Sequence, residues 1–168
     1  MAVKTIEDLF IHELSDIYSA EKQLTKALPR LARAATAPEL KKAFETHLEE
    51  TQGQVERIDQ IVEALGIRLK RIKCAAMEGL VEEGKEVIEE VEAGALRDAA
   101  LIGGAQKVEH YEIASYGTLS AIAKQLGYQE ALPLLQATLK EEKATDEKLT
   151  MLAEQAGNQR AAEKSKAA

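Results

Sequence analysis

Residues 14–31, LSDIYSAEKQLTKALPRL, carry the pattern that decides the fold. Apolar side chains recur at steps of three and four residues, and one glutamate, Glu21, stands among them in the same register. These steps match the 3.6-residue period of an α-helix, so the stretch predicts one buried face of one long helix. The stripe consists of Leu14, Ile17, Glu21, Leu24, Leu28 and Leu31.

Capping residues and terminal glycines predict three further long helices. Thr5 begins the first helix, Thr36 caps the second, and Gly127 ends the third as a left-handed cap. A connection of about 30 residues between the second and third helices carries a shorter, fifth helix and is long enough to cross a bundle. The long helices are predicted at residues 5–35, 36–66, 98–127 and 129–156.

The chain is therefore predicted to be all-α, a four-helix bundle with a long crossover that carries a short fifth helix. One domain is expected over residues 1–156, followed by a disordered tail at 157–168, where no apolar period remains. The composition agrees, because 45 % of residues are hydrophobic but only 4 % are aromatic, and Trp is absent.

Charge and cysteine usage narrow the expected partners and compartment. The net charge of −7 argues against a nucleic-acid-binding face, and the basic cluster at residues 68–73 is interpreted as a solvated loop. The sequence contains no apolar run of about 18 residues, so no membrane span is predicted. A single cysteine, Cys74, cannot form an internal disulfide, which is typical of a reducing cytoplasm.

Four glutamates occupy matched positions on the predicted core stripes. Glu21 and Glu50 are 29 residues apart, and Glu112 and Glu142 are 30 apart, so each pair straddles its hairpin turn almost symmetrically. Each then lies roughly 21 Å from its turn at 1.5 Å per residue, near mid-helix, and the four carboxylates are expected to lie close together.

Buried like charges must be protonated, paired with cations or neutralised by metal. Few basic residues share the stripes, and carboxylates can bridge two ions, so the pattern favours a dinuclear divalent metal site. Three neighbours are further candidate ligands, each with a rival interpretation. Glu109 and Asp146 lie one turn from the stripes and could instead be solvated flanks, and His47 could be a hydrogen-bonded core residue.

Several strings resemble the YciF-like bacterial stress proteins of the ferritin-like superfamily. They include DIYSAEKQL at 16–24, HLEET at 47–51, KCAAMEGL at 73–80, QKVEHYEIASY at 106–116 and EEKATD at 141–146. The resemblance covers roughly residues 5–153. It implies a ferritin-like homodimer whose subunit has four long helices and a short fifth one, expression under stress, and kinship with rubrerythrins and ferritins.

One departure from the ferritin-like pattern bears on the metal. Di-iron bundles use Glu-x-x-His on two helices, but here Gly53 follows Glu50 and Thr145 follows Glu142 at that spacing. An oxygen-rich site shifts preference toward harder ions such as Mn²⁺ or Mg²⁺. The expected cofactor is two divalent ions, iron or manganese, with magnesium a further choice.

Two functions follow from the sequence, and it does not decide whether the protein is an enzyme. The first is a cytoplasmic stress protein whose metal site handles oxygen, peroxide or iron. The second is a metal-free homodimeric protein with a structural or partner-binding role and no catalysis.

Overall fold

The computed structural model describes residues 3–154 and 162–163, and within them five helices and no strand. They are α1 (Ile6–Ala34), α2 (Pro38–Leu65), α3 (Ala75–Glu90), α4 (Ala95–Leu126) and α5 (Ala131–Leu152). The predicted all-α bundle and its fifth helix on the crossover are confirmed. The predicted tail, residues 157–168, lies outside the described residues except for 162–163. No helix in the described part of the chain is long and apolar enough to cross a membrane.

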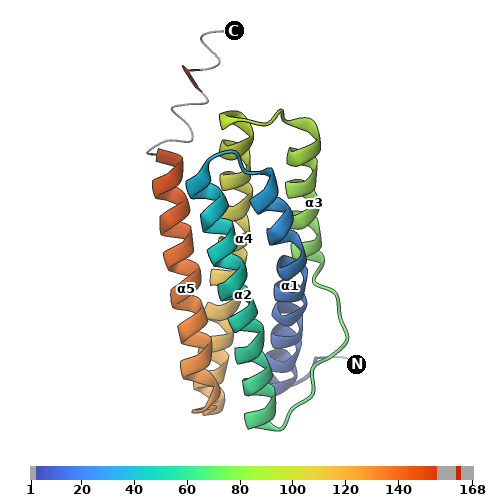
Figure 1. Ribbon diagram of the computed structural model, residues 1–168. Helices are drawn as coiled ribbons and strands as arrows, with labels where there is room; N and C mark the ends of the chain where they lie inside the picture. Colours follow the sequence, from blue (N-terminus) through green and yellow to red (C-terminus); the bar gives the residue numbers. More distant parts are fainter. Residues whose placement is uncertain (1–2, 155–161, 164–168) are drawn as a thin grey trace.

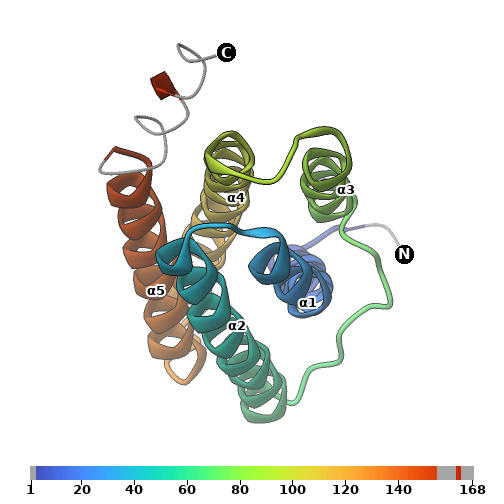
Figure 2. The same cartoon turned by 45° about the horizontal axis from the view of Figure 1, so that its top comes forward.

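Two antiparallel hairpins, α1–α2 and α4–α5, pack side by side into the bundle (Figure 1). The crossover at residues 66–74 runs along the outside of the molecule and leads into α3, so α2 and α4 point in one direction and α1 and α5 in the other (Figure 1). Figure 2 shows α3 outside the four-helix core, beside α1 and α4. Met77 is the one fully buried residue of α3, and the partly buried Leu80, Val81, Val87 and Ile88 also pack against the core.

The first helix begins as its sequence predicts. The Thr5 hydroxyl accepts a hydrogen bond from Asp8 N at 3.0 Å, and the Asp8 carboxylate accepts one from Thr5 N at 3.1 Å. This reciprocal pair is a capping box. The positive φ of Gly66 (62°) and Gly127 (70°) gives α2 and α4 left-handed C-caps, a backbone conformation in which glycine carries no Cβ penalty.

The second helix begins differently from its prediction. Ala37, not Thr36, is the N-cap, and no side chain of this turn caps the helix. The Asp98 carboxylate of α4 instead binds the turn just before the helix, accepting hydrogen bonds from Thr36 N at 2.7 Å and Ala37 N at 2.8 Å. Asp98 is buried, and its negative charge is favourable beside a helix N-terminus, so this distant carboxylate fixes the turn from which α2 begins.

A continuous apolar core fills the bundle above and below one polar layer. Leu14, Ile17 and Leu24 of α1 are buried, as the opening stripe predicts. Cys74 is a packed residue that also caps α3, because its Sγ accepts a hydrogen bond from Met77 N at 3.4 Å. The polar layer that interrupts this apolar core is the candidate site.

Candidate metal centre

A layer of ionisable side chains crosses the middle of the bundle core. Five of them expose between 0 and 4 % of their surface: Glu21, His47, Glu109, Glu112 and Glu142. They come from all four long helices, with Glu21 on α1, His47 on α2, Glu142 on α5 and the other two on α4. We call these five residues the carboxylate cluster.

The helical period explains how α4 contributes two acids. Glu109 and Glu112 are three residues apart, so both project on the same side of the helix. Glu109 lies on the side of α4 that faces α2 and α5, and its Oε1 is 3.2 Å from His47 Nε2. Glu109 is consequently 1 % exposed, and its interpretation as a solvated flank is wrong.

Four members of the cluster converge closely enough to share an ion. One donor atom from each of His47, Glu109, Glu112 and Glu142 lies within 4.8 Å of all the others. His47 Nε2 is 3.2 Å from Glu109 Oε1, although neither ring nitrogen makes a hydrogen bond. An ion with ligand bonds of about 2.0–2.2 Å holds its ligands at most about 4.4 Å apart, so donors within 4.8 Å of one another would need to move only slightly to share one.

Most oxygen atoms in the cluster have no protein partner. Neither carboxylate oxygen of Glu112 or Glu142 makes a hydrogen bond, and one oxygen each of Glu21 and Glu109 is also unpartnered. Buried polar atoms in folded proteins are nearly always satisfied. The cluster therefore contains several carboxylate oxygens that have no hydrogen-bond partner and lie close together. A bound cation would satisfy them.

Burial controls the acidity of the cluster. Loss of solvation, followed by the charges of Glu142 and Glu21, raises the pKa of Glu112 well above its usual range. Burial likewise raises the pKa values of Glu21, Glu109 and Glu142. Without a cation, the cluster is thus most stable with several of its carboxyl groups protonated.

A second polar group lies beside the cluster and links the two hairpins. Arg57 of α2 makes two hydrogen bonds of 2.6 Å to the Glu141 carboxylate of α5 and one of 3.1 Å to Thr138. Gln54 donates to the same carboxylate at 3.2 Å. Arg57 is therefore engaged by Glu141, and among the described residues no Lys or Arg forms an ion pair with a cluster member.

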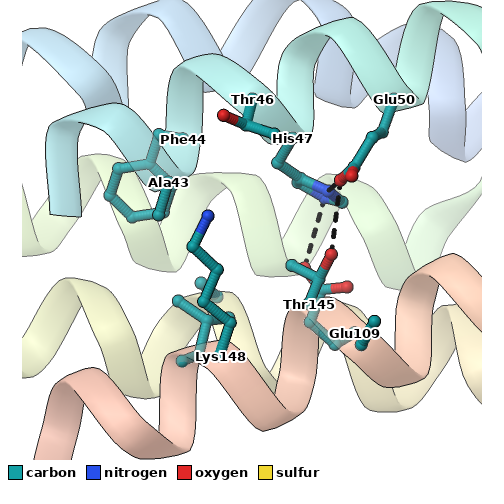
Figure 3. A pocket seen from close by; sticks show the side chains of 11 residues that line it. Ala43, Phe44, Thr46, His47, Glu50, Glu109, Thr145 and Lys148 are labelled. Atoms are coloured by element: carbon teal, nitrogen blue, oxygen red, sulfur yellow. Dashed lines mark hydrogen bonds and ion pairs between the residues drawn. The ribbon is translucent and has the colours of Figure 1, made fainter. Parts of the chain in front are cut away.

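A small pocket between α2 and α5 leads to the cluster from outside. It has a volume of about 100 Å³, with His47 and Glu109 at its inner end. Figure 3 shows Glu50, Thr145 and Lys148 around these two residues. Glu50 lies 3.7 Å from His47 Nδ1, and this interaction lowers the pKa of Glu50. The pocket can hold a few water-sized molecules.

Two predicted ligands lie outside the buried group. The Glu50 side chain is 36 % exposed, because α2 buries His47, Thr51 and Gln54, and Glu50 stands to one side of that stripe. Its prediction as a core-facing carboxylate is wrong, although it remains at the pocket entrance. The Asp146 carboxylate accepts a hydrogen bond from Gln106 at 3.3 Å and faces the exposed His110.

Sequence reasoning missed the residue that supports Glu21. The Tyr116 hydroxyl donates a hydrogen bond to Glu21 Oε1, and the ring is 1 % exposed. Tyr116 follows Glu112 by four residues, about one helical turn, so both side chains lie on the buried side of α4. Tyr18, three residues before Glu21, lies instead beside Asp59.

Removing the Tyr116 hydroxyl is expected to destabilise the protein by about 1–3 kcal/mol, because Tyr116→Phe leaves a buried Glu21 oxygen without its donor. Urea unfolding measures this change. Tyr128→Phe is the matched control, since that hydroxyl bonds an exposed Glu7 at 3.2 Å and its loss should have little effect. Equal stability of the two variants would show that the Glu21 contact contributes nothing.

The fold and the cluster together define a class: a four-helix bundle with an interior carboxylate and histidine site. The chain belongs to the family described as "Domain of unknown function (DUF892)", whose model matches residues 5–162. It is 66 % identical over 154 residues to Protein YciF of Escherichia coli strain K12, covering 91 % of this chain and 93 % of that protein.

Solved structures of similar proteins agree with the fold. The crystal structure of the E. coli stress protein YciF matches with a TM-score of 0.87, covering 89 % of this chain and 95 % of that one. YcfI of Rhodopseudomonas palustris, described as a candidate structural protein, is 46 % identical, with a TM-score of 0.85 over 88 % and 94 % of the two chains. The predicted membership of the YciF-like group is confirmed.

Proposed function

We propose that this protein binds divalent metal at the carboxylate cluster and uses it on a small oxygen species or on Fe²⁺ itself. The observation that carries the proposal is the convergence of four buried donors within 4.8 Å, most of whose atoms have no other partner. His47, Glu109, Glu112 and Glu142 would hold the first ion. Glu21, whose free oxygen belongs to the same layer, would extend the set toward a second ion.

The donor chemistry favours manganese or iron, with magnesium a weaker choice. One imidazole suits a transition ion, and several carboxylates suit a hard divalent ion. A bound ion of this kind would supply a Lewis acid and, if it is iron or manganese, a redox centre. The protein's own part is to fix the donors in a water-poor layer and to admit only small molecules through the pocket beside Lys148.

Metal analysis of protein purified without chelator tests the proposal directly. We expect bound metal, and we expect Mn²⁺ or anaerobic Fe²⁺ to raise the unfolding temperature of the stripped protein. Loss of a residue that only supports a ligand weakens metal binding roughly 10- to 100-fold. His47→Gln removes a ligand itself, so it should weaken metal binding by more than that. His110→Gln is the matched control, because that ring is 70 % exposed. No bound metal and no thermal shift with either ion would refute the proposal.

Activity requires a separate measurement. Iron-loaded protein exposed to air or peroxide should consume the oxidant and develop new near-ultraviolet absorption, and His47→Gln should do so more slowly. Metal binding without oxidant consumption would restrict the function to metal storage or structure.

The second candidate function is a metal-free structural protein. It is favoured by the raised pKa values of the buried carboxyl groups, since protonation alone can neutralise them. The description of the R. palustris relative points the same way for that protein. The homodimer implied by the resemblance belongs to both proposals, and sedimentation of the purified protein tests it.

A further inference from the structure

The imidazole ring of His47 lies between two carboxylates. Its Nε2 is 3.2 Å from Glu109 Oε1 inside the cluster, and its Nδ1 is 3.7 Å from Glu50 Oε2 at the pocket entrance. The ring is 4 % exposed, and neither nitrogen makes a hydrogen bond. A neutral imidazole carries one N–H and one bare nitrogen, and only the bare nitrogen can bind a metal. The proton must therefore lie on Nδ1, on the Glu50 side, for Nε2 to join the donor set.

Glu50 is placed to accept a hydrogen bond from that Nδ1–H. It follows His47 by three residues on α2, so the two side chains lie on the same side of the helix. The Thr145 hydroxyl of α5 donates a hydrogen bond of 3.4 Å to the same Oε2 atom, which ties the carboxylate to the facing helix. Figure 3 shows Glu50 beside the His47 ring, with Thr145 across from them. Glu50 is 36 % exposed, so it is free to shift by the roughly 0.5–1 Å that a hydrogen bond to Nδ1 requires.

We propose that Glu50 is a positioning residue for the metal site: its carboxylate accepts a hydrogen bond from His47 Nδ1, which leaves Nε2 bare and directed at the cluster. This inference rests on the proposed metal-binding function, because it concerns how one of the four donors is held ready. A carboxylate that binds the second nitrogen of a histidine ligand fixes the orientation of the ring and raises its basicity. Glu50 thus acts on the site through His47 and does not bind the ion itself.

Glu109 is the competing candidate for this role. In the metal-free protein a protonated Glu109 could donate a hydrogen bond to His47 Nε2 and hold the same tautomer from the other side. It would then occupy the nitrogen atom that must bind the ion, and it has to release that atom when metal enters. Only a partner on the Nδ1 side can hold the tautomer in both the metal-free and the metal-bound protein.

Nitrogen NMR of the metal-free protein, with isotope-labelled histidine, tests the tautomer without any bound ion. We expect His47 to carry its proton on Nδ1 at about pH 8, where an imidazole of ordinary pKa, about 6.5, is neutral. Glu50→Ala should move the proton toward Nε2, and Glu50→Gln should keep it on Nδ1, because the amide oxygen still accepts. His47→Gln identifies the His47 signals among the three histidines of the chain. An unchanged tautomer in Glu50→Ala would assign the role to Glu109 and overturn the proposal.

Calorimetric titration with Mn²⁺ tests the effect of Glu50 on the ion. Glu50→Ala should weaken Mn²⁺ binding roughly 10- to 100-fold, the usual effect of losing a residue that supports a ligand, and Glu50→Gln should recover most of that loss. Glu49→Ala is the matched control and should bind Mn²⁺ as the wild type does, because this exposed neighbour on the same helix carries the same charge. Circular dichroism establishes that each variant is folded.

The outcomes separate the role of Glu50 from the proposed function. Failure of the wild type to bind Mn²⁺ or anaerobic Fe²⁺ would refute the metal site, and the role of Glu50 with it. Equal Mn²⁺ binding by the wild type and Glu50→Ala would overturn only the role of Glu50. If Glu50→Gln loses as much affinity as Glu50→Ala, the charge of Glu50 rather than its hydrogen bond acts on the ion, and the positioning role is also overturned.

Discussion

Leucine in place of Glu112 is expected to stabilise the metal-free protein by about 1–4 kcal/mol, the range seen when buried ionic groups are replaced by apolar ones of similar volume. Glu112 is fully buried, and neither of its carboxylate oxygens has a hydrogen-bond partner. The core therefore gains an apolar contact and loses an unsatisfied acid. In a domain of this size the unfolding temperature should rise by roughly 2–4 °C for each kcal/mol.

The same Glu112→Leu variant should lose the thermal stabilisation that Mn²⁺ gives to the wild type, because one of the converging donors is gone. Thermal unfolding of both proteins, stripped and with added Mn²⁺, measures both effects. Glu147→Leu is the control, since this glutamate on α5 is exposed and its replacement should change stability by less than about 0.5 kcal/mol. A full Mn²⁺ response in Glu112→Leu would remove Glu112 from the proposed ligand set.

The second large effect concerns Asp98. Asp98→Ala is expected to cost about 2–4 kcal/mol, because it leaves two backbone N–H groups at the start of α2 without their charged acceptor. Urea unfolding measures the loss. Asp98→Asn should recover part of it, because the amide keeps one oxygen acceptor.

Asp8→Ala is the comparison for Asp98→Ala. Asp8 caps α1 through similar bonds but is less buried than Asp98, so its loss should cost only about 1 kcal/mol. If the two variants lose the same stability, burial of Asp98 adds nothing to its role as a cap.

The sequence predicts the long helices well because their signals are local. The stripe at residues 14–31 and the Thr5 capping box depend on residues within a few turns of each other, and the structure contains both. The cap of α2 could not be found in this way. Asp98 is 62 residues from Thr36, and only the packing of α4 against that turn brings them together.

The candidate site shows the same limit at single residues. Glu50 is predicted to lie on a core stripe and Glu109 one turn from one, but only Glu109 is buried. The difference depends on how the helices pack together, because Glu109 faces His47 of α2 whereas Glu50 stands beside the buried stripe of α2. The period of one helix does not contain that information, so it predicts acids in the core but not that Glu109 rather than Glu50 is buried there. Tyr116 was missed for the same reason.

The cluster also has a consequence for the order in which the protein folds. Glu21 and His47 belong to the first hairpin, whereas Glu109, Glu112 and Glu142 belong to the second. Each hairpin is held by contacts close in sequence and can form early, but the association of the two must bring all five ionisable groups into one layer. Docking of the hairpins is therefore the step that the acids oppose, and neither half alone offers the complete donor set.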